Sequence, residues 1–257
     1  MTVAYTDDEP RSAYIPDEEL ITTYGLNPLA ILCYRNGFDC LETVKTMNPT
    51  PDDINHKCSY DMTPFLYACD NNNIPLVQWL IEQGADVSQT SETGFGALHG
   101  VASTFGDEGI ELAKILIAAG CDVNASDEYG DTPLHVACIS SSKSGASLLI
   151  QFLLQQGANP DSRSKKKTTP LHEACAGYDV IREVNVIKAL LDGGAPVNAI
   201  DSKGMTPLML VCRHFRTYNI GVVNLLLKRG ADIEIKDRDG FTPVSNVLQE
   251  YHYEKRD

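Results

Sequence analysis

The chain has 257 residues, of which 43% are hydrophobic and 22% charged, and its net charge is −14. It has no run of about 18 apolar residues, so we expect no transmembrane helix and no membrane insertion. An acidic surface repels phosphates, which argues against nucleic acid as a partner. However, residues 131–257 carry 14 acidic and 16 basic side chains, so anion binding in that half stays open.

Residues 1–23 form an acidic segment without any repeat signal. The first 20 residues contain six acidic residues and one basic residue, Arg11. A secretory signal begins with basic residues followed by an apolar run, and neither is present here. We therefore interpret residues 1–23 as a partly ordered tail and expect a cytoplasmic protein, with the nucleus as an alternative.

A repeated pattern follows the tail. Related strings occur in chain order as NPLAILC (27–33), TPFLYAC (63–69), GALHGVA (96–102), TPLHVAC (132–138), TPLHEAC (169–175), TPLMLVC (206–212) and TPVSNVL (242–248). Each of the last six follows a second string by a constant spacing; these are PDDIN, QGADV, AGCDVN, QGANPD, GGAPVN and RGADIE. A spacing that recurs in every unit indicates internal repeats.

Each unit predicts two helices and a turn. Thr followed by Pro suits the start of a helix, and the short helix that follows has a narrow apolar face. A longer, more apolar helix comes next, for example over 74–83 or 147–156, and ends at a glycine. A turn rich in Asp, Ser and Gly then leads into the next unit. One unit cannot bury its own apolar face, so neighbouring units must stack.

These strings resemble the ankyrin repeat family, whose signature is T-P-L-H-x-A. The resemblance covers about 24–250 and implies an all-α solenoid of stacked helix-turn-helix units with hairpin-like turns. It places an ankyrin repeat domain at 24–257 behind the tail 1–23. Its expected repeats are 24–58, 59–91, 92–127, 128–164, 165–201 and 202–237, with a C-terminal cap at 238–257.

Most units are three or four residues longer than the family's 33. Because the spacing from the glycine to the next unit is constant, the extra residues lie between the two helices of a unit. We expect these insertions near 34–39, 103–109, 139–146, 176–184 and 213–220. The last unit is expected to stop after its first helix, 242–253.

Cysteine and histidine each recur at one position of the repeat. Equivalent positions on packed helices lie about 8–10 Å apart, too far for disulfides, so we interpret the cysteine column as core; its members are Cys33, Cys69, Cys138, Cys175 and Cys212. Cys40, Cys58 and Cys121 lie outside the column and stay candidates for reactive thiols. The resemblance implies that His99, His135 and His172 bind turn backbone. The string HEAC at 172–175 lacks the second histidine of a zinc motif.

Asparagine recurs at Asn55, Asn124 and Asn198. The resemblance implies a site that is hydroxylated in some animal proteins. The alternative is a turn residue that makes local hydrogen bonds.

The resemblance also implies that partners bind a concave face made of turn tips and the outer sides of the short helices. By phase, the candidate contact residues are Tyr60, Met62, Phe95, Tyr129, Lys165, Lys166, Met205, Arg213, His214 and Phe241. We hypothesise that the aromatic and methionine side chains form a discontinuous apolar stripe that anchors the partner. The alternative is that they pack on neighbouring turns.

A basic cluster is a second candidate, and it can recognise an acidic peptide or a phosphate group. Its members are Arg163, Lys165, Lys166 and Lys167 with Arg213, His214 and Arg216. The alternative is a solvated loop.

We expect a monomeric protein-protein interaction module that acts as an adaptor, scaffold or inhibitor for one or more proteins. No catalytic motif is present, so we expect no enzyme, no cofactor, no metal and no catalytic residue. Two alternatives stay open: a substrate-recruiting subunit of a ubiquitin ligase, and a microbial or viral effector that targets host proteins.

Overall fold

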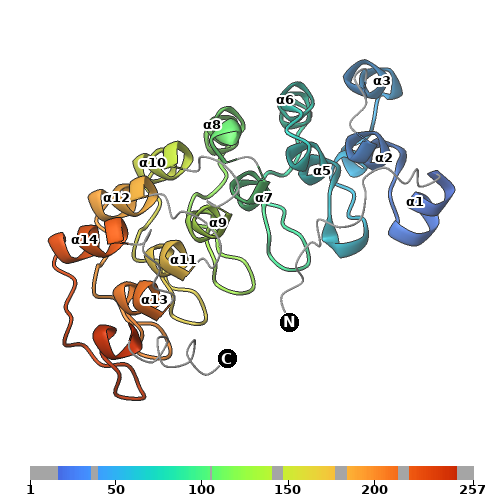
Figure 1. Cartoon of the computed structure of the whole chain (residues 1–257). Helices are drawn as coiled ribbons and strands as arrows, with labels where there is room; N and C mark the ends of the chain where they lie inside the picture. Colours follow the sequence, from blue (N-terminus) through green and yellow to red (C-terminus); the bar gives the residue numbers. More distant parts are fainter. Residues whose placement is uncertain are drawn as a thin grey trace. The chain divides into compact units, whose positions relative to one another are not determined.

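The computed structural model describes residues 17–35, 40–104, 106–140, 147–176, 184–213 and 220–247. The chain forms two compact units, Met1–Asp86 (unit 1) and Val87–Asp257 (unit 2) (Figure 1). Most of each predicted insertion between paired helices lies outside the described residues, except for 103–109, most of which is described. The predicted last helix, 242–253, is described through residue 247, and residues 243–247 are helical.

Unit 1 contains two stacked helix pairs, one extra helix before them and two short helical segments between them. Its elements are α1 (Asp17–Tyr24), α2 (Pro28–Arg35), α3 (Cys40–Met47), α4 (Pro51–Ile54), η1 (Ser59–Asp61), α5 (Pro64–Asp70) and α6 (Ile74–Glu82). Helix α2 packs on α5 and α3 packs on α6, so equivalent helices of successive repeats lie side by side (Figure 1).

Helix α1 falls in the segment for which we expected a partly ordered tail. Its Leu20 is buried in a small cluster with Leu26 and Ile31, at the start of the first repeat. The helix is followed by Gly25, whose φ of 63° is left-handed, and the Leu26 N–H donates to the Leu20 carbonyl at 3.2 Å. One leucine and a glycine cap therefore order the residues directly before the first repeat.

Unit 2 contains two layers of helices, as the repeat pattern predicts. The elements are α7 (Ala97–Thr104), η2 (Gly106–Gly109), α8 (Ile110–Ala118), α9 (Pro133–Ser140), α10 (Ser147–Gln155), α11 (Pro170–Ala176), α12 (Val184–Asp192), α13 (Pro207–Arg213) and α14 (Ile220–Lys228). The short helices α7, α9, α11 and α13 form the inner row, and α8, α10, α12 and α14 form the outer row (Figure 1). Within the described residues the chain forms no strand, so the all-α prediction is confirmed.

The glycine after each outer helix reverses the chain. Gly120, Gly157, Gly194 and Gly230 have φ values of 88° to 103°, a region that other residues avoid. The next N–H then donates back into the last helical turn, for example from Ala158 to the Leu153 carbonyl at 2.9 Å. This cap sets where the turn to the next repeat begins.

The core lies between the two rows. Leu116, Leu153, Leu190 and Leu226 recur at one position of the outer helices, and each is at most 1% exposed. The cysteine column is buried in α2 and α5 of unit 1 and in α9, α11 and α13 of unit 2, which confirms its packing role. All eight cysteines are free thiols. No described helix is long and apolar enough to cross a membrane.

Candidate protein-binding surface

Each turn that precedes an inner helix folds into a closed five-residue finger. The fingers of unit 2 are 91–95, 127–131, 164–168, 201–205 and 237–241. In each, the first N–H donates to the fifth carbonyl at 3.0 Å, and the fourth residue has positive φ. A side-chain oxygen of the first residue accepts the fifth N–H, for example Asp201 Oδ1 from Met205 at 2.8 Å. The Asp, Ser and Gly composition therefore makes one fixed turn and not a variable loop.

Neighbouring fingers bind one another through their backbones. The second residue of each finger donates to the third residue of the finger before it, as Lys165 does to the Tyr129 carbonyl at 2.7 Å. Ser202 donates in the same way to Lys166, and Arg238 to Lys203, at 2.8 and 3.0 Å. The third residues are consequently presented in register along unit 2.

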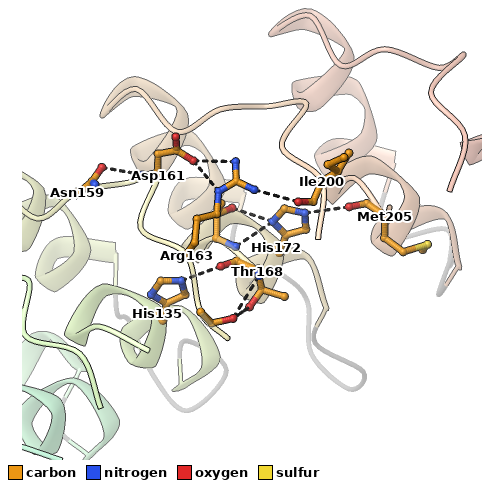
Figure 2. Close-up of polar contacts among 10 residues, drawn as sticks. His135, Asn159, Asp161, Arg163, Thr168, His172, Ile200 and Met205 are labelled. Carbon is orange, nitrogen blue, oxygen red and sulfur yellow. Dashed lines mark hydrogen bonds and ion pairs between the residues drawn. The ribbon is translucent and has the colours of Figure 1, made fainter. Parts of the chain in front are cut away.

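Buried histidines attach the fingers to the inner helices (Figure 2). His135 Nδ1 accepts the Thr132 N–H at 3.2 Å, and its Nε2 donates to the Thr168 carbonyl of the next finger at 3.1 Å. His172 repeats this arrangement from Thr169 to Met205. Because Nδ1 accepts, the proton lies on Nε2, and burial lowers the pKa of both rings. These histidines are neutral structural bridges, as the resemblance implied.

The position within the finger decides which candidate contact residues reach solvent. Unit 1 has a similar finger at 58–62, because the Cys58 N–H donates to the Met62 carbonyl at 2.8 Å and Asp61 has a φ of 57°. The third residues Tyr60 and Tyr129 are 68% and 44% exposed, and Lys166 is exposed. Lys165, a second residue, is also exposed. These side chains are available to a partner.

Fifth residues turn inward, so the expectation of exposed methionines at the tips is wrong. Met62 is 8% exposed, and Met205 is 3% exposed. Phe95 and Phe241 are half-buried, and the Phe95 ring lies 5.1 Å from the His99 ring. The carbonyl of Met205 accepts from His172 of the preceding inner helix, and its N–H donates to Asp201 Oδ1, so the closed finger holds this fifth residue in its buried position.

The inner helices contribute further exposed side chains. Arg213 is exposed at the end of α13, as predicted, whereas His214 and Arg216 lie outside the described residues. Ile139 in α9 is 52% exposed, a high value for an isoleucine on the row that carries the fingers. A partner that covers Ile139 would remove this apolar surface from water.

Two half-buried carboxylates at the base of the fingers escaped the sequence analysis. Burial, and next the charge of Asp127, raise the pKa of Asp131 to about 6, while Lys166 opposes the shift. Burial also raises the pKa of Glu173 in α11, and Asp131 adds to that effect. For Glu173 the sequence signal was an acidic residue at a position where the other inner helices carry Gly, Val or Leu.

The thiols outside the column do not have the features of reactive cysteines. Cys40 and Cys58 are buried, and burial raises the pKa of Cys58 and of the half-buried Cys121 to about 11. A nucleophilic cysteine needs the opposite shift. Among the described residues, no three His, Cys, Asp or Glu side chains are grouped to hold a metal ion.

Comparison with known proteins places this architecture in a family. The chain is 31% identical over 120 residues to a protein of Caenorhabditis elegans, the transient receptor potential cation channel subfamily A member 1 homolog. It is 37% identical over 83 residues to human ankyrin repeat and SOCS box protein 9, and 35% identical over 75 residues to the mouse B-cell lymphoma 3 protein homolog. These matches cover 47%, 32% and 29% of this chain, but only 9%, 27% and 16% of the relatives.

The family model described as ankyrin repeats matches three times, over residues 12–91, 88–151 and 140–237. Together these matches span most of the sequence, including both units. On this evidence and on the repeated finger and helix geometry, the chain belongs to the ankyrin repeat family.

Proposed function

We propose that this chain is a non-enzymatic adaptor, scaffold or inhibitor that binds a segment of a partner protein on the inner row and fingers of unit 2. Ankyrin repeats are protein-interaction modules, and that general role comes with the family. The finer proposal rests on one observation: Tyr129 and Ile139, in the finger and the inner helix of a single repeat, are both large and largely exposed.

The chemistry of these two side chains suits an interface. Tyrosine offers a wide apolar ring and a polar end, and such residues often dominate binding energies. Arg213 lies two repeats further along the inner row and adds a planar cation for an acceptor on the partner. We propose a monomer in the cytoplasm or nucleus.

The test is quantitative affinity capture from cell extract with the full chain and two matched variants. Tyr129→Ser with Ile139→Ser removes the proposed anchors. Leu148→Ser with Leu227→Ser makes equivalent changes on the outer row, where those leucines are 56% and 43% exposed. We expect the first variant to lose partner capture about tenfold or more and the second to retain it.

Equal capture by both variants would exclude the inner row and fingers as the binding surface. Met205 is left unchanged because it is buried, so its substitution would disturb packing and not a contact surface. Circular dichroism of both variants should match that of the parent chain.

A second candidate role is recruitment of substrates to a ubiquitin ligase. It is favoured by the 37% identity to the protein named for its ankyrin repeats and SOCS box. In this case the captured partner should gain ubiquitin when the chain is supplied to cells and should not gain it with the Tyr129→Ser, Ile139→Ser variant. Unchanged ubiquitination with both would remove this candidate.

A further inference from the structure

Three successive fingers of unit 2 border a pocket of about 400 Å³. It lies beside the third, fourth and fifth fingers, and four of its side chains are cationic. Its lining residues are Arg163, Lys167, Ile200, Asp201, Gly204, Lys236, Asp237 and Arg238. The basic cluster expected from the sequence is therefore divided, since Lys165, Lys166 and Arg213 do not line this pocket.

Arg163 is held in place on one side of the pocket (Figure 2). Its Nη1 donates to the Ile200 carbonyl at 2.9 Å, and its Nε donates to Asp161 Oδ1 at 3.1 Å. The same carboxylate lies 3.0 Å from Nη2. A guanidinium fixed before a ligand arrives loses less side-chain freedom on binding.

Lys167 occupies a position that the other fingers of unit 2 give to glycine. Gly94, Gly130, Gly204 and Gly240 have φ of 77° to 84°, and Lys167 has φ of 59°. A side chain in this left-handed region costs about 1 kcal/mol. This backbone conformation places the Lys167 side chain at the pocket. Strained backbone of this kind often occurs at functional positions.

The cations are only partly balanced by the two acids in the lining. Asp201 Oδ1 accepts the Lys203 and Met205 N–H groups, and Asp237 Oδ1 accepts those of Asp239 and Phe241. Among the described residues, Lys167, Lys236 and Arg238 form no ion pair. With Asp161, which pairs with Arg163, the four positive groups face three negative ones and keep a net charge of +1 in a chain whose total is −14.

We propose that this pocket binds a phosphorylated side chain of the partner protein. A phosphoester carries a charge of about −1.5 to −2 at neutral pH and three acceptor oxygens. These complement the three lining cations that form no ion pair among the described residues, Lys167, Lys236 and Arg238. A single carboxylate offers less charge and only two acceptor oxygens to the same three cations. This inference rests on the proposed function, because it specifies the chemistry of a bound segment.

The test uses the full chain labelled with ¹⁵N and two probes, N-acetyl-O-phosphoserine methylamide and its aspartate analogue. We expect the phosphoserine probe to shift the amide signals of Ile200, Gly204 and Arg238 with saturation, at a dissociation constant on the order of 1 mM. The aspartate probe should bind about fivefold or more weakly, since it carries less charge. Inorganic phosphate should compete with the phosphoserine probe.

Lys167→Gly is the decisive variant because it restores the residue used by the other fingers. It should weaken phosphoserine binding about five- to tenfold, while the urea midpoint of unfolding stays the same or rises. Lys165→Ala is the matched control, since it removes an equal charge from a neighbouring residue outside the pocket and should leave binding unchanged.

Several results would overturn the proposal. These are no saturation by about 50 mM phosphoserine probe, equal binding of the aspartate analogue, or equal weakening in Lys165→Ala. None of them depends on the Tyr129 and Ile139 surface. Partner capture that needs those two side chains but is indifferent to Lys167→Gly would retain the proposed function and reject this site.

Discussion

At the scale of single residues, Asp131 combines a fixed backbone with an unfavourably placed carboxylate. Its N–H donates to Asp127 Oδ1 at 2.8 Å, and its carbonyl accepts from His99 Nε2 at 3.1 Å. Its own Oδ1 is buried without a hydrogen-bond partner among the described residues. Burial and Asp127 therefore raise its pKa to about 6. These backbone hydrogen bonds hold Asp131 in a position where its carboxylate is partly removed from water, which is unfavourable for the charged form.

Asp131→Asn should stabilise the protein at neutral pH. A carboxyl whose folded pKa is raised stabilises the fold below its unfolded pKa of about 3.9, and this contribution is lost as pH rises through about 6. We expect the variant to raise the free energy of unfolding by about 1–2 kcal/mol above pH 7 and to match the parent below pH 4. Urea unfolding at pH 7.5 and 3.8 measures both.

The control for that prediction is Asp239→Asn, which removes the same charge from an exposed position in the last finger. It should change stability little at either pH. A lower free energy of unfolding for Asp131→Asn at pH 7.5 would show that the carboxylate has a partner that stabilises it.

At the scale of elements, the recurring asparagines join successive repeats, and Asn55 also makes the local bond of the alternative, from its Nδ2 to the Pro51 carbonyl at 3.3 Å. Asn124 Nδ2 donates to the Gly157 carbonyl at 3.0 Å, and its Oδ1 accepts the Asn159 N–H at 2.8 Å. Asn198 binds Gly230 and Asp232 in the same way. Each asparagine thus satisfies two backbone groups at the glycine cap of the next repeat. Hydroxylation of these residues remains a prediction.

Asn124→Ala should therefore destabilise unit 2 more than an ordinary turn substitution. It removes two exposed hydrogen bonds between repeats, to the Gly157 carbonyl and from the Asn159 N–H, each worth about 0.5–1.5 kcal/mol. The matched control is Asn159→Ala, because within the described residues the Asn159 side chain accepts the nearby Asp161 N–H and makes no bond to another repeat. Urea unfolding should show the larger loss for Asn124→Ala, and equal losses would contradict a joint between repeats.

At the scale of the whole molecule, both units bury their cysteines between stacked repeats. Of the eight thiols, seven are buried and Cys121 is half-buried. Burial raises the pKa of Cys212 as well as Cys121 to about 11, and it raises the pKa of Cys138 well above its usual value. The native protein therefore keeps little thiolate at ordinary pH.

Native thiols should react slowly with Ellman's reagent at pH 8, and Cys121 should react first. Cys121→Ser should remove the fastest phase, whereas Cys212→Ser should leave it unchanged. In denaturant all eight thiols of the parent chain should titrate rapidly. Fast native reaction of several thiols would mean that the stacked repeats open readily.

Periodicity was enough to predict most of the architecture, because in stacked repeats each unit contacts mainly its neighbours. The glycines that end the outer helices, the Thr-Pro helix starts and the buried histidine positions all follow from one recurring string. Helix α1 was missed because it has no counterpart in the repeats, and tertiary contacts order it, among them the burial of Leu20 and the ion pair of Asp17 with Arg35.

The sequence by itself determined the fold class, the repeat phase and the buried columns, since each depends on local chemistry that recurs in every unit. Only the tertiary structure decided which finger residues face solvent. Tyr129 and Met205 differ by two places within equivalent fingers, and the closed turn directs the third residue outward and the fifth inward. The tertiary structure also groups Lys167 with Lys236 and Arg238, because hydrogen bonds between fingers bring together residues that are distant in the chain.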